Sequence, residues 1–253
     1  MRTFQHSLEM LWQEEDQLVE WAKEQLHDPK HQTEHVEMIE LYMDTVDLLR
    51  KQHIKGDRKY ALISLFMRTS DNFGVALRLA MSGRYRFCAM VLRDQMETGF
   101  LIDYLMEAPG RPERWLASGG NNPDYKPYKI REALDVRDRL RNPNLPAKSR
   151  RSEQYAMLST LGAHPGPLGM TLHKDGAKAL NLGPFKQRDM LKECVEEAAR
   201  SWVLVTGRLL EFCSEFERDG QGISSPLALR FQKIHEQYFS PNAHRAAPDS
   251  GCA

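Results

Sequence analysis

Two consecutive segments that are apolar on nearly every side constrain the fold of this chain most. Residues 60–81 read YALISLFMRTSDNFGVALRLAM, and residues 84–107 read RYRFCAMVLRDQMETGFLIDYLME. Both have helical period, and a helix that is apolar around most of its circumference has to be buried among other helices. Only Ser82 and Gly83 separate the two segments, so we expect an antiparallel helical hairpin. The sequence therefore predicts a multi-helix bundle built around this central pair.

The rest of the chain supplies helices that would cover the central pair. Helical period predicts further helices at about 2–27, 33–54, 128–141, 150–162, 185–218 and 225–239. Glycine and proline concentrate at 162–183, where the turn-prone Lys174-Asp175-Gly176 predicts a small β-hairpin at about 170–182. We expect an all-α fold with one helical domain over residues 1–239 and a disordered tail over residues 240–253.

Charge and composition exclude several classes of protein. The 253 residues include 35 Lys plus Arg and 35 Asp plus Glu, which gives a net charge of zero. A protein dedicated to duplex DNA is usually more basic, so no dedicated duplex-DNA surface is expected. No apolar run is long enough to span a membrane, and the acid-rich N-terminus does not read as a signal peptide. The four scattered cysteines favour reduced thiols in a cytoplasmic protein that has no membrane partner.

One string resembles a metal-binding motif. His31-Gln32-Thr33-Glu34-His35 matches the H-x-x-E-H pattern of inverted zinc peptidases, which places both histidines in one helix. Here Pro29 lies just upstream, and Thr33 is suited to cap the start of a helix. Because a helix that begins at Thr33 leaves His31 outside it, we expect no metal site and no cofactor.

The central helices carry arginines at helical spacing. Arg86 and Arg93 lie seven residues apart and share a face, which Glu97 extends by another turn. Planar guanidinium groups inside a bundle are suited to bind phosphate or carboxylate. One interpretation of this face is therefore an anion-binding pocket between the central helices.

The other interpretation is an internal ion-pair network, because a buried guanidinium needs a partner. In this interpretation Arg93 pairs with Glu97, and Arg78 pairs with Asp71 or Asp103. The sequence alone leaves both interpretations open.

A second group of polar residues lies in the segment EQYAMLSTLGAHPG. Tyr155 and Ser159 are four residues apart and should share a helix face, while His164 follows the end of the helix. The two hydroxyl groups and the imidazole could bind a ligand together, or His164 could cap the last carbonyl groups of the helix. No further acid or base follows at a defined spacing, so a catalytic triad is not expected.

The chain resembles a group of helical proteins over residues 84–165. The pattern consists of the arginine-bearing apolar helix VLRDQMETGFLIDYL, the segment APGRPERWL, a charged helix and then YAMLSTLGAHP. Some proteins with this pattern resemble the HEPN superfamily (higher eukaryotes and prokaryotes nucleotide-binding). The resemblance implies a compact helical bundle that is often a homodimer and is in some cases an RNase of toxin–antitoxin or phage-defence systems.

Metal-independent HEPN RNases carry an R-x4-6-H motif, usually with a polar residue after the arginine. Arg230 and His235 match this spacing, but Phe231 departs from the preference for a polar residue. The resemblance implies that His235 would act as general acid or base and that Arg230 would stabilise charge on phosphate.

Three functional hypotheses follow. The first is an effector that binds a nucleotide or RNA in an anion-accepting pocket. The residues expected to line that pocket are Arg86, Arg93, Glu97, Tyr155, Ser159 and His164. The second is an RNase that acts through Arg230 and His235, with two copies meeting in a dimer. The third is a non-catalytic interaction or regulatory protein, in which the polar groups serve only to specify the fold.

Overall fold

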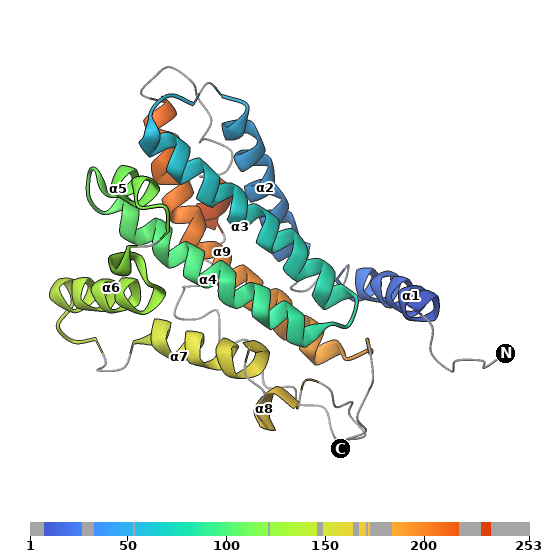
Figure 1. Ribbon diagram of the computed structural model, residues 1–253. Coiled ribbons are helices and arrows are strands. Elements are labelled where there is room, and N and C mark those ends of the chain that lie inside the picture. Colours follow the sequence, from blue (N-terminus) through green and yellow to red (C-terminus); the bar gives the residue numbers. More distant parts are fainter. Residues whose placement is uncertain are drawn as a thin grey trace.

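The described part of the protein is almost wholly helical and contains no strand, which confirms the all-α prediction for these residues (Figure 1). The structure, a computed structural model, describes residues 8–26, 33–52, 54–120, 122–145, 149–163, 167–170, 172, 184–217 and 229–233. The long helices are α1 (Leu8–Leu26), α2 (Thr33–Arg50), α3 (Asp57–Met81), α4 (Tyr85–Met106), α6 (Pro127–Arg141) and α9 (Arg188–Glu217). The shorter elements are α5 (Arg111–Ala117), η1 (Pro123–Tyr125), α7 (Arg150–Leu158), the π-helical turn η2 (Ser159–Ala163) and α8 (Pro167–Met170).

Helices α3 and α4 run in opposite directions and pack against each other (Figure 1). A Schellman turn ends α3: the N–H of Gly83 donates to the carbonyl of Ala80 at 3.1 Å, and that of Arg84 donates to Leu79 at 2.8 Å. Gly83 has φ 71°, and a Cβ there would lie 2.6 Å from the carbonyl oxygen of Phe185. Glycine is therefore required both by the turn and by the close approach of the segment before α9.

Helix α9 packs along α4 in the same direction. Tyr85 at the start of α4 meets Phe185 with ring centroids 5.4 Å apart, and Asp103 near its end binds Arg208 of α9. Between these contacts, Gly99 faces Val205, whose Cγ2 lies only 3.1 Å from where a Cβ would be. The absence of a side chain at Gly99 lets the two helices approach closely.

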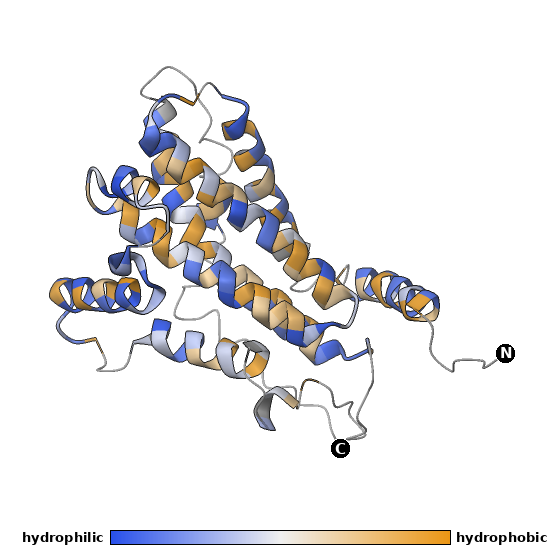
Figure 2. Ribbon diagram, in the orientation of Figure 1, coloured by the Kyte–Doolittle hydropathy of each residue, from blue (hydrophilic) through white to orange (hydrophobic). Residues whose placement is uncertain are grey.

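The interior of the bundle is formed by α2, α3, α4 and α9. Its largest fully buried side chains include Tyr42, Phe66, Phe73, Tyr85, Trp202 and Phe212. Figure 2 shows apolar residues along much of α3 and α4, with hydrophilic residues interrupting α4 about halfway along its length. These hydrophilic residues coincide with the arginine-bearing stretch of α4.

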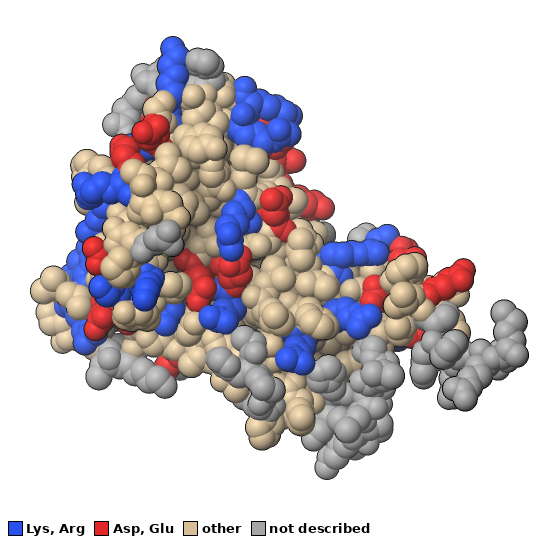
Figure 3. Space-filling view, in the orientation of Figure 1, with Lys and Arg blue, Asp and Glu red and all other residues tan. Residues whose placement is uncertain are grey.

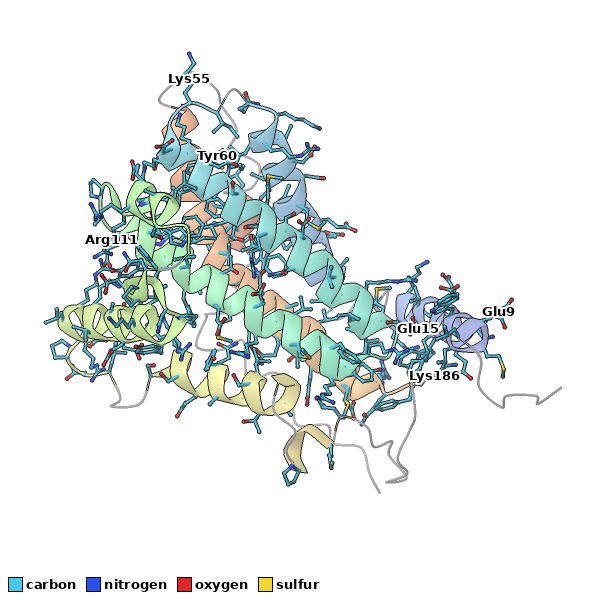
Figure 4. The ribbon with its side chains drawn as sticks, viewed as in Figure 1. Glu9, Glu15, Lys55, Tyr60, Arg111 and Lys186 are labelled. Carbon is cyan, nitrogen blue, oxygen red and sulfur yellow. The ribbon has the colours of Figure 1, made fainter. Side chains whose placement is uncertain are left out.

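Helix α1 attaches at the turn between α3 and α4. Nε of Arg84 donates to Glu15 at 2.7 Å, and Glu15 is labelled in Figure 4. Arg78 donates to Asp16 at 3.3 Å, so the expected pairing of Arg78 with Asp71 or Asp103 is wrong. In an antiparallel pair that turns at Gly83, Arg78 lies near the start of α4, whereas Asp103 lies near its end.

Several expectations fall on residues that the structure does not describe. The structure gives no support to the β-hairpin at about 170–182: Met170 ends helix α8, Leu172 lies in a 3-10 turn, and 173–182 are outside the described residues. Pro167 at the first position of α8 suits a helix start. The tail at 240–253 is also outside the described residues. The described part of α2 spans Thr33–Arg50, and His31 of the H-x-x-E-H string is outside the described residues.

Within the described residues, none of the helices combines the length and the apolar character that crossing a membrane requires.

Candidate functional site

Asp103 fixes α6 and α9 beside α4. Its side chain is 3% exposed, and both of its carboxylate oxygens accept hydrogen bonds from Arg137 of α6 at 2.9 Å. Arg208 of α9 donates to the same carboxylate. Burial alone would raise the pKa of Asp103, but the hydrogen bonds from Arg137 and the charge of Arg208 outweigh it and lower the pKa. The carboxylate is therefore ionised and joins three helices.

The start of α7 is held against α6. Ser149 caps α7 by accepting a hydrogen bond from the N–H of Ser152 at 3.2 Å, and its hydroxyl donates to Asp135 of α6 at 2.7 Å. Arg151, in the first turn of α7, donates to Asp135 at 3.0 Å and also to Asp138. These contacts place the next turn of α7, with Tyr155, between α4 and α6.

Tyr155 lies at the centre of a group that we call the tyrosine cluster, which consists of Arg93, Glu97, Arg131, Tyr155 and Ser159. Arg93 Nη2 donates to the Tyr155 hydroxyl at 2.6 Å and to Glu97 at 3.2 Å. The guanidinium carbon of Arg131 lies 3.6 Å from the centroid of the Tyr155 ring, and that of Arg93 lies 4.9 Å from it. Two cations from different helices therefore contact one aromatic ring.

The expected ion pair between Arg93 and Glu97 is confirmed, but it does not seal Arg93. The two side chains are 29% and 21% exposed. Burial alone would lower the pKa of Arg93, but the charge of Glu97 and the hydrogen bond to Tyr155 raise it. Arg93 thus remains a cation that solvent reaches.

Three polar atoms of the tyrosine cluster are buried without a hydrogen-bond partner among the described residues. They are Nε of Arg93, Nη1 of Arg131 and Oγ of Ser159. Ser159 is 5% exposed and lies one helical turn after Tyr155, at the start of the π-helical turn η2. The Tyr155 oxygen accepts from Arg93, so its own hydrogen is free to donate. The cluster therefore holds more hydrogen-bond donors than acceptors.

The charges of the tyrosine cluster do not balance. Within the described residues Arg93 has Glu97 as its only carboxylate partner, and Arg131 has none. Arg68 of α3 instead donates to both oxygens of Asp94, the residue after Arg93, at 2.6 and 3.2 Å. The cluster carries one uncompensated positive charge.

Arg86, expected in the same pocket, has a different role. Its Nε donates to the carbonyl of Gly162 at 3.2 Å, which fixes η2 against α4. A Cβ at Gly162 would lie 2.8 Å from the backbone nitrogen of Met90, so the two segments are in close contact. His164 lies outside the described residues. Of the expected pocket, the structure brings Arg93, Glu97 and Tyr155 into contact, and Ser159 follows one helical turn after Tyr155.

The residues of the R-x4-6-H string are only partly described. Arg230 is 54% exposed, and its Nη2 donates to Glu37 of α2 at 3.0 Å. His235 lies outside the described residues. The guanidinium that would act on phosphate is paired with an acid.

Sequence reasoning missed Arg131. It lies in the charged segment REALDVRDRLR with three other arginines, and no local pattern distinguishes it from them. Its role depends on α7 folding back beside α6, which is a long-range contact.

Three cavities in the described part of the molecule are lined by residues other than those of the tyrosine cluster. A cavity of about 580 Å³ is bordered by Arg58, Glu113 and Glu215, and one of about 290 Å³ lies between α2 and α3. The third, of about 380 Å³, lies between α4, α7 and α9 and is lined by Leu92, Leu161 and Cys194, among others. No three His, Cys, Asp or Glu side chains of the described ranges are grouped so that they could hold a metal ion.

No protein-family model, curated protein or solved structure matches this chain. The function therefore has to be argued from the geometry of the tyrosine cluster itself.

Proposed function

We propose that the protein binds a ligand that carries an oxyanion, a phosphate or a carboxylate, at the tyrosine cluster between α4, α6 and α7. The observation that carries this proposal is the set of buried groups without partners, Arg93 Nε, Arg131 Nη1 and Ser159 Oγ. A buried polar group that lacks a partner costs about 1–3 kcal/mol, so a ligand that supplies the partners gains this energy.

The chemistry of the free groups favours an anion over a cation or a neutral molecule. Guanidinium nitrogens donate and cannot accept, and the free hydrogen of Tyr155 also donates. Hydrogen bonds from arginine to an oxyanion are charge-assisted and roughly twice as strong as neutral ones. The uncompensated charge of Arg131 adds attraction at the same point.

This proposal includes the expectation of a nucleotide- or RNA-binding effector, because both ligands carry phosphate. A role in toxin–antitoxin or phage-defence systems, HEPN-like ancestry, a homodimer and a cytoplasmic location all stay predictions. RNase activity through Arg230 and His235 has less support, since Glu37 pairs with Arg230. A non-catalytic interaction protein remains the alternative if no anion binds.

The test is thermal unfolding in inorganic phosphate and in chloride at matched ionic strength. Ligand that binds only the folded state stabilises it by about 2.7 kcal/mol at a hundred times the Kd. We expect the stabilisation by phosphate in the wild type and in Arg141→Gln, and its loss in Arg131→Gln. Arg141 is a matched control because it lies on the same helix, is 64% exposed and pairs with Glu107. Equal stabilisation of all three proteins, or of none, would contradict the proposal.

Ser159→Ala provides an independent test. Removing a buried hydroxyl that has no partner should leave the free protein as stable as the wild type or more stable, by up to about 1 kcal/mol. The same change should reduce the stabilisation by phosphate. A variant that loses stability in chloride and keeps the full phosphate effect would show that Ser159 serves the fold alone.

A further inference from the structure

The arginines around the tyrosine cluster are largely neutralised. Those that pair with acids include Arg68 with Asp94, Arg111 and Arg141 with Glu107, Arg137 with Asp103, and Arg151 with Asp135 and Asp138. On the face seen in Figure 3, basic and acidic side chains are interspersed, and no continuous basic stripe crosses it. A polyanion bound through many phosphates needs such a stripe of free cations.

Two arginines near the cluster donate to backbone carbonyls instead of acids. Arg86 donates to Gly162 and Arg139 to Asp135. Helical rise places Arg86 about 10 Å along α4 from Arg93, and Arg139 about 12 Å along α6 from Arg131. Both guanidinium groups already donate to the backbone, whereas Arg131 has no described hydrogen-bond partner, and one free charge suits a single anionic group.

The free donors match a terminal phosphoryl group best. Arg93 offers one hydrogen on Nε, Arg131 offers those of Nη1, and the hydroxyls of Tyr155 and Ser159 offer one each. A phosphomonoester presents three free oxygens and a charge of about −1.5 to −2 at neutral pH. An internal phosphodiester or a carboxylate presents only two oxygens and one charge.

The burial of these donors also favours a terminal phosphoryl group. Nε of Arg93, Nη1 of Arg131 and Oγ of Ser159 are all inaccessible to solvent, although the Arg93 side chain as a whole is 29% exposed. A ligand can therefore reach these donors only where the exposed Arg93 side chain moves aside, and a terminal group can enter there end-on. An internal phosphate would have to bring the chain on both of its sides into the bundle.

Resting on the proposed function, we infer that the ligand is a small phosphomonoester, whose terminal phosphoryl group binds Arg93, Arg131 and the hydroxyls of Tyr155 and Ser159. RNA held through its internal phosphodiesters is the competing class of ligand.

The experiment is isothermal titration calorimetry of the full chain with three probes: phenyl phosphate, dimethyl phosphate and a single-stranded RNA with a 5′-hydroxyl end. Phenyl phosphate should bind at least about ten-fold more tightly than dimethyl phosphate, because it supplies a further oxygen and charge. Its affinity should fall between about pH 7.5 and pH 5.5, as the phosphomonoester takes up a proton near a pKa of about 6. The affinity of dimethyl phosphate should not change over this range.

Matched variants assign the binding to the cluster. Arg131→Gln should reduce the affinity for phenyl phosphate by about ten-fold or more, and Arg141→Gln should reduce it by less than about two-fold. Ser159→Ala removes one donor without changing charge, and it serves as a second variant if Arg131→Gln does not fold. Equal losses in Arg131→Gln and Arg141→Gln, or no loss in Ser159→Ala where Arg131→Gln is unfolded, would overturn the assignment.

The outcomes separate this inference from the proposed function. RNA could bind more tightly than phenyl phosphate, with an affinity that falls steeply with salt and depends on Arg131. This result would overturn the inference of a phosphomonoester ligand but would still support an oxyanion site. Equal affinities for phenyl phosphate and dimethyl phosphate would do the same. Absence of binding by all three probes would overturn both.

Discussion

Replacing Asp103 with asparagine should destabilise the protein more than any change at a surface ion pair. The carboxylate is 3% exposed and accepts hydrogen bonds from Arg137 and Arg208, so Asp103→Asn leaves two guanidinium groups without their shared partner. Breaking a buried ion pair from one side costs about 3–5 kcal/mol. In the variant Arg137 still pairs with Asp138, at 2.8 Å, and Arg208 still pairs with Glu211. The expected loss therefore lies near the lower limit of this range.

The assay is equilibrium unfolding in urea, followed by the fluorescence of tryptophan, one of which, Trp202, is 1% exposed. A loss of about 3 kcal/mol corresponds to roughly a hundred-fold change in the unfolding equilibrium constant. The control is Asp94→Asn, because Asp94 and its partner Arg68 are 38% and 57% exposed. That pair should contribute less than about 1 kcal/mol.

The stabilisation by Asp103 should depend on pH in a defined direction. The pKa of Asp103 in the folded protein lies below its ordinary value of 3.8, so the stabilisation is complete above that value. It is lost as the pH falls through the lower folded pKa. The difference in free energy of unfolding between the wild type and Asp103→Asn should therefore be constant near neutral pH and should decrease below about pH 3.8. If Asp103→Asn loses no more free energy of unfolding at neutral pH than Asp94→Asn does, the reasoning is refuted.

Three further changes test the packing and the site. Gly162→Ala should lower stability by about 1–3 kcal/mol in thermal unfolding, because the new Cβ would lie 2.8 Å from the Met90 backbone nitrogen; an unchanged Tm would refute the close contact. Thr206→Val should raise stability by about 1 kcal/mol, since the hydroxyl is fully buried without a described partner; a loss in urea unfolding would mean that the hydroxyl is satisfied. Tyr155→Phe should weaken phenyl phosphate in calorimetry by about 1 kcal/mol, because it removes a donor and the acceptor that orients Arg93; unchanged affinity would place the ligand elsewhere.

The helices could be predicted from the sequence because their signals are local. The apolar period over 60–81 and 84–107 locates α3 and α4 to within a few residues, and the Ser82-Gly83 link corresponds to the Schellman turn. The expected helix at 150–162 corresponds to α7 followed by a π-helical turn, which periodicity does not distinguish.

The candidate site could be predicted only where its residues share a helix. Arg93 with Glu97 and Tyr155 with Ser159 are each four residues apart, so helical geometry alone makes each pair neighbours. Arg131 joins them through the fold of α6 and α7, which Asp135 and Arg151 hold together. Such contacts between distant segments leave no pattern in the sequence. For the same reason the partner predicted for Arg78 is wrong.

The most direct test of the central claim is NMR of the arginine side chains during titration with phenyl phosphate. The claim is that Nε of Arg93, which has no described partner, donates to the bound oxyanion, whereas Nε of Arg68 already donates to Asp94. We expect the Arg93 Nε–H signal to shift and saturate with the ligand, while the Arg68 signal stays in place. An Arg93 signal that does not move, or that moves no more than the Arg68 signal, would contradict an oxyanion site at the tyrosine cluster.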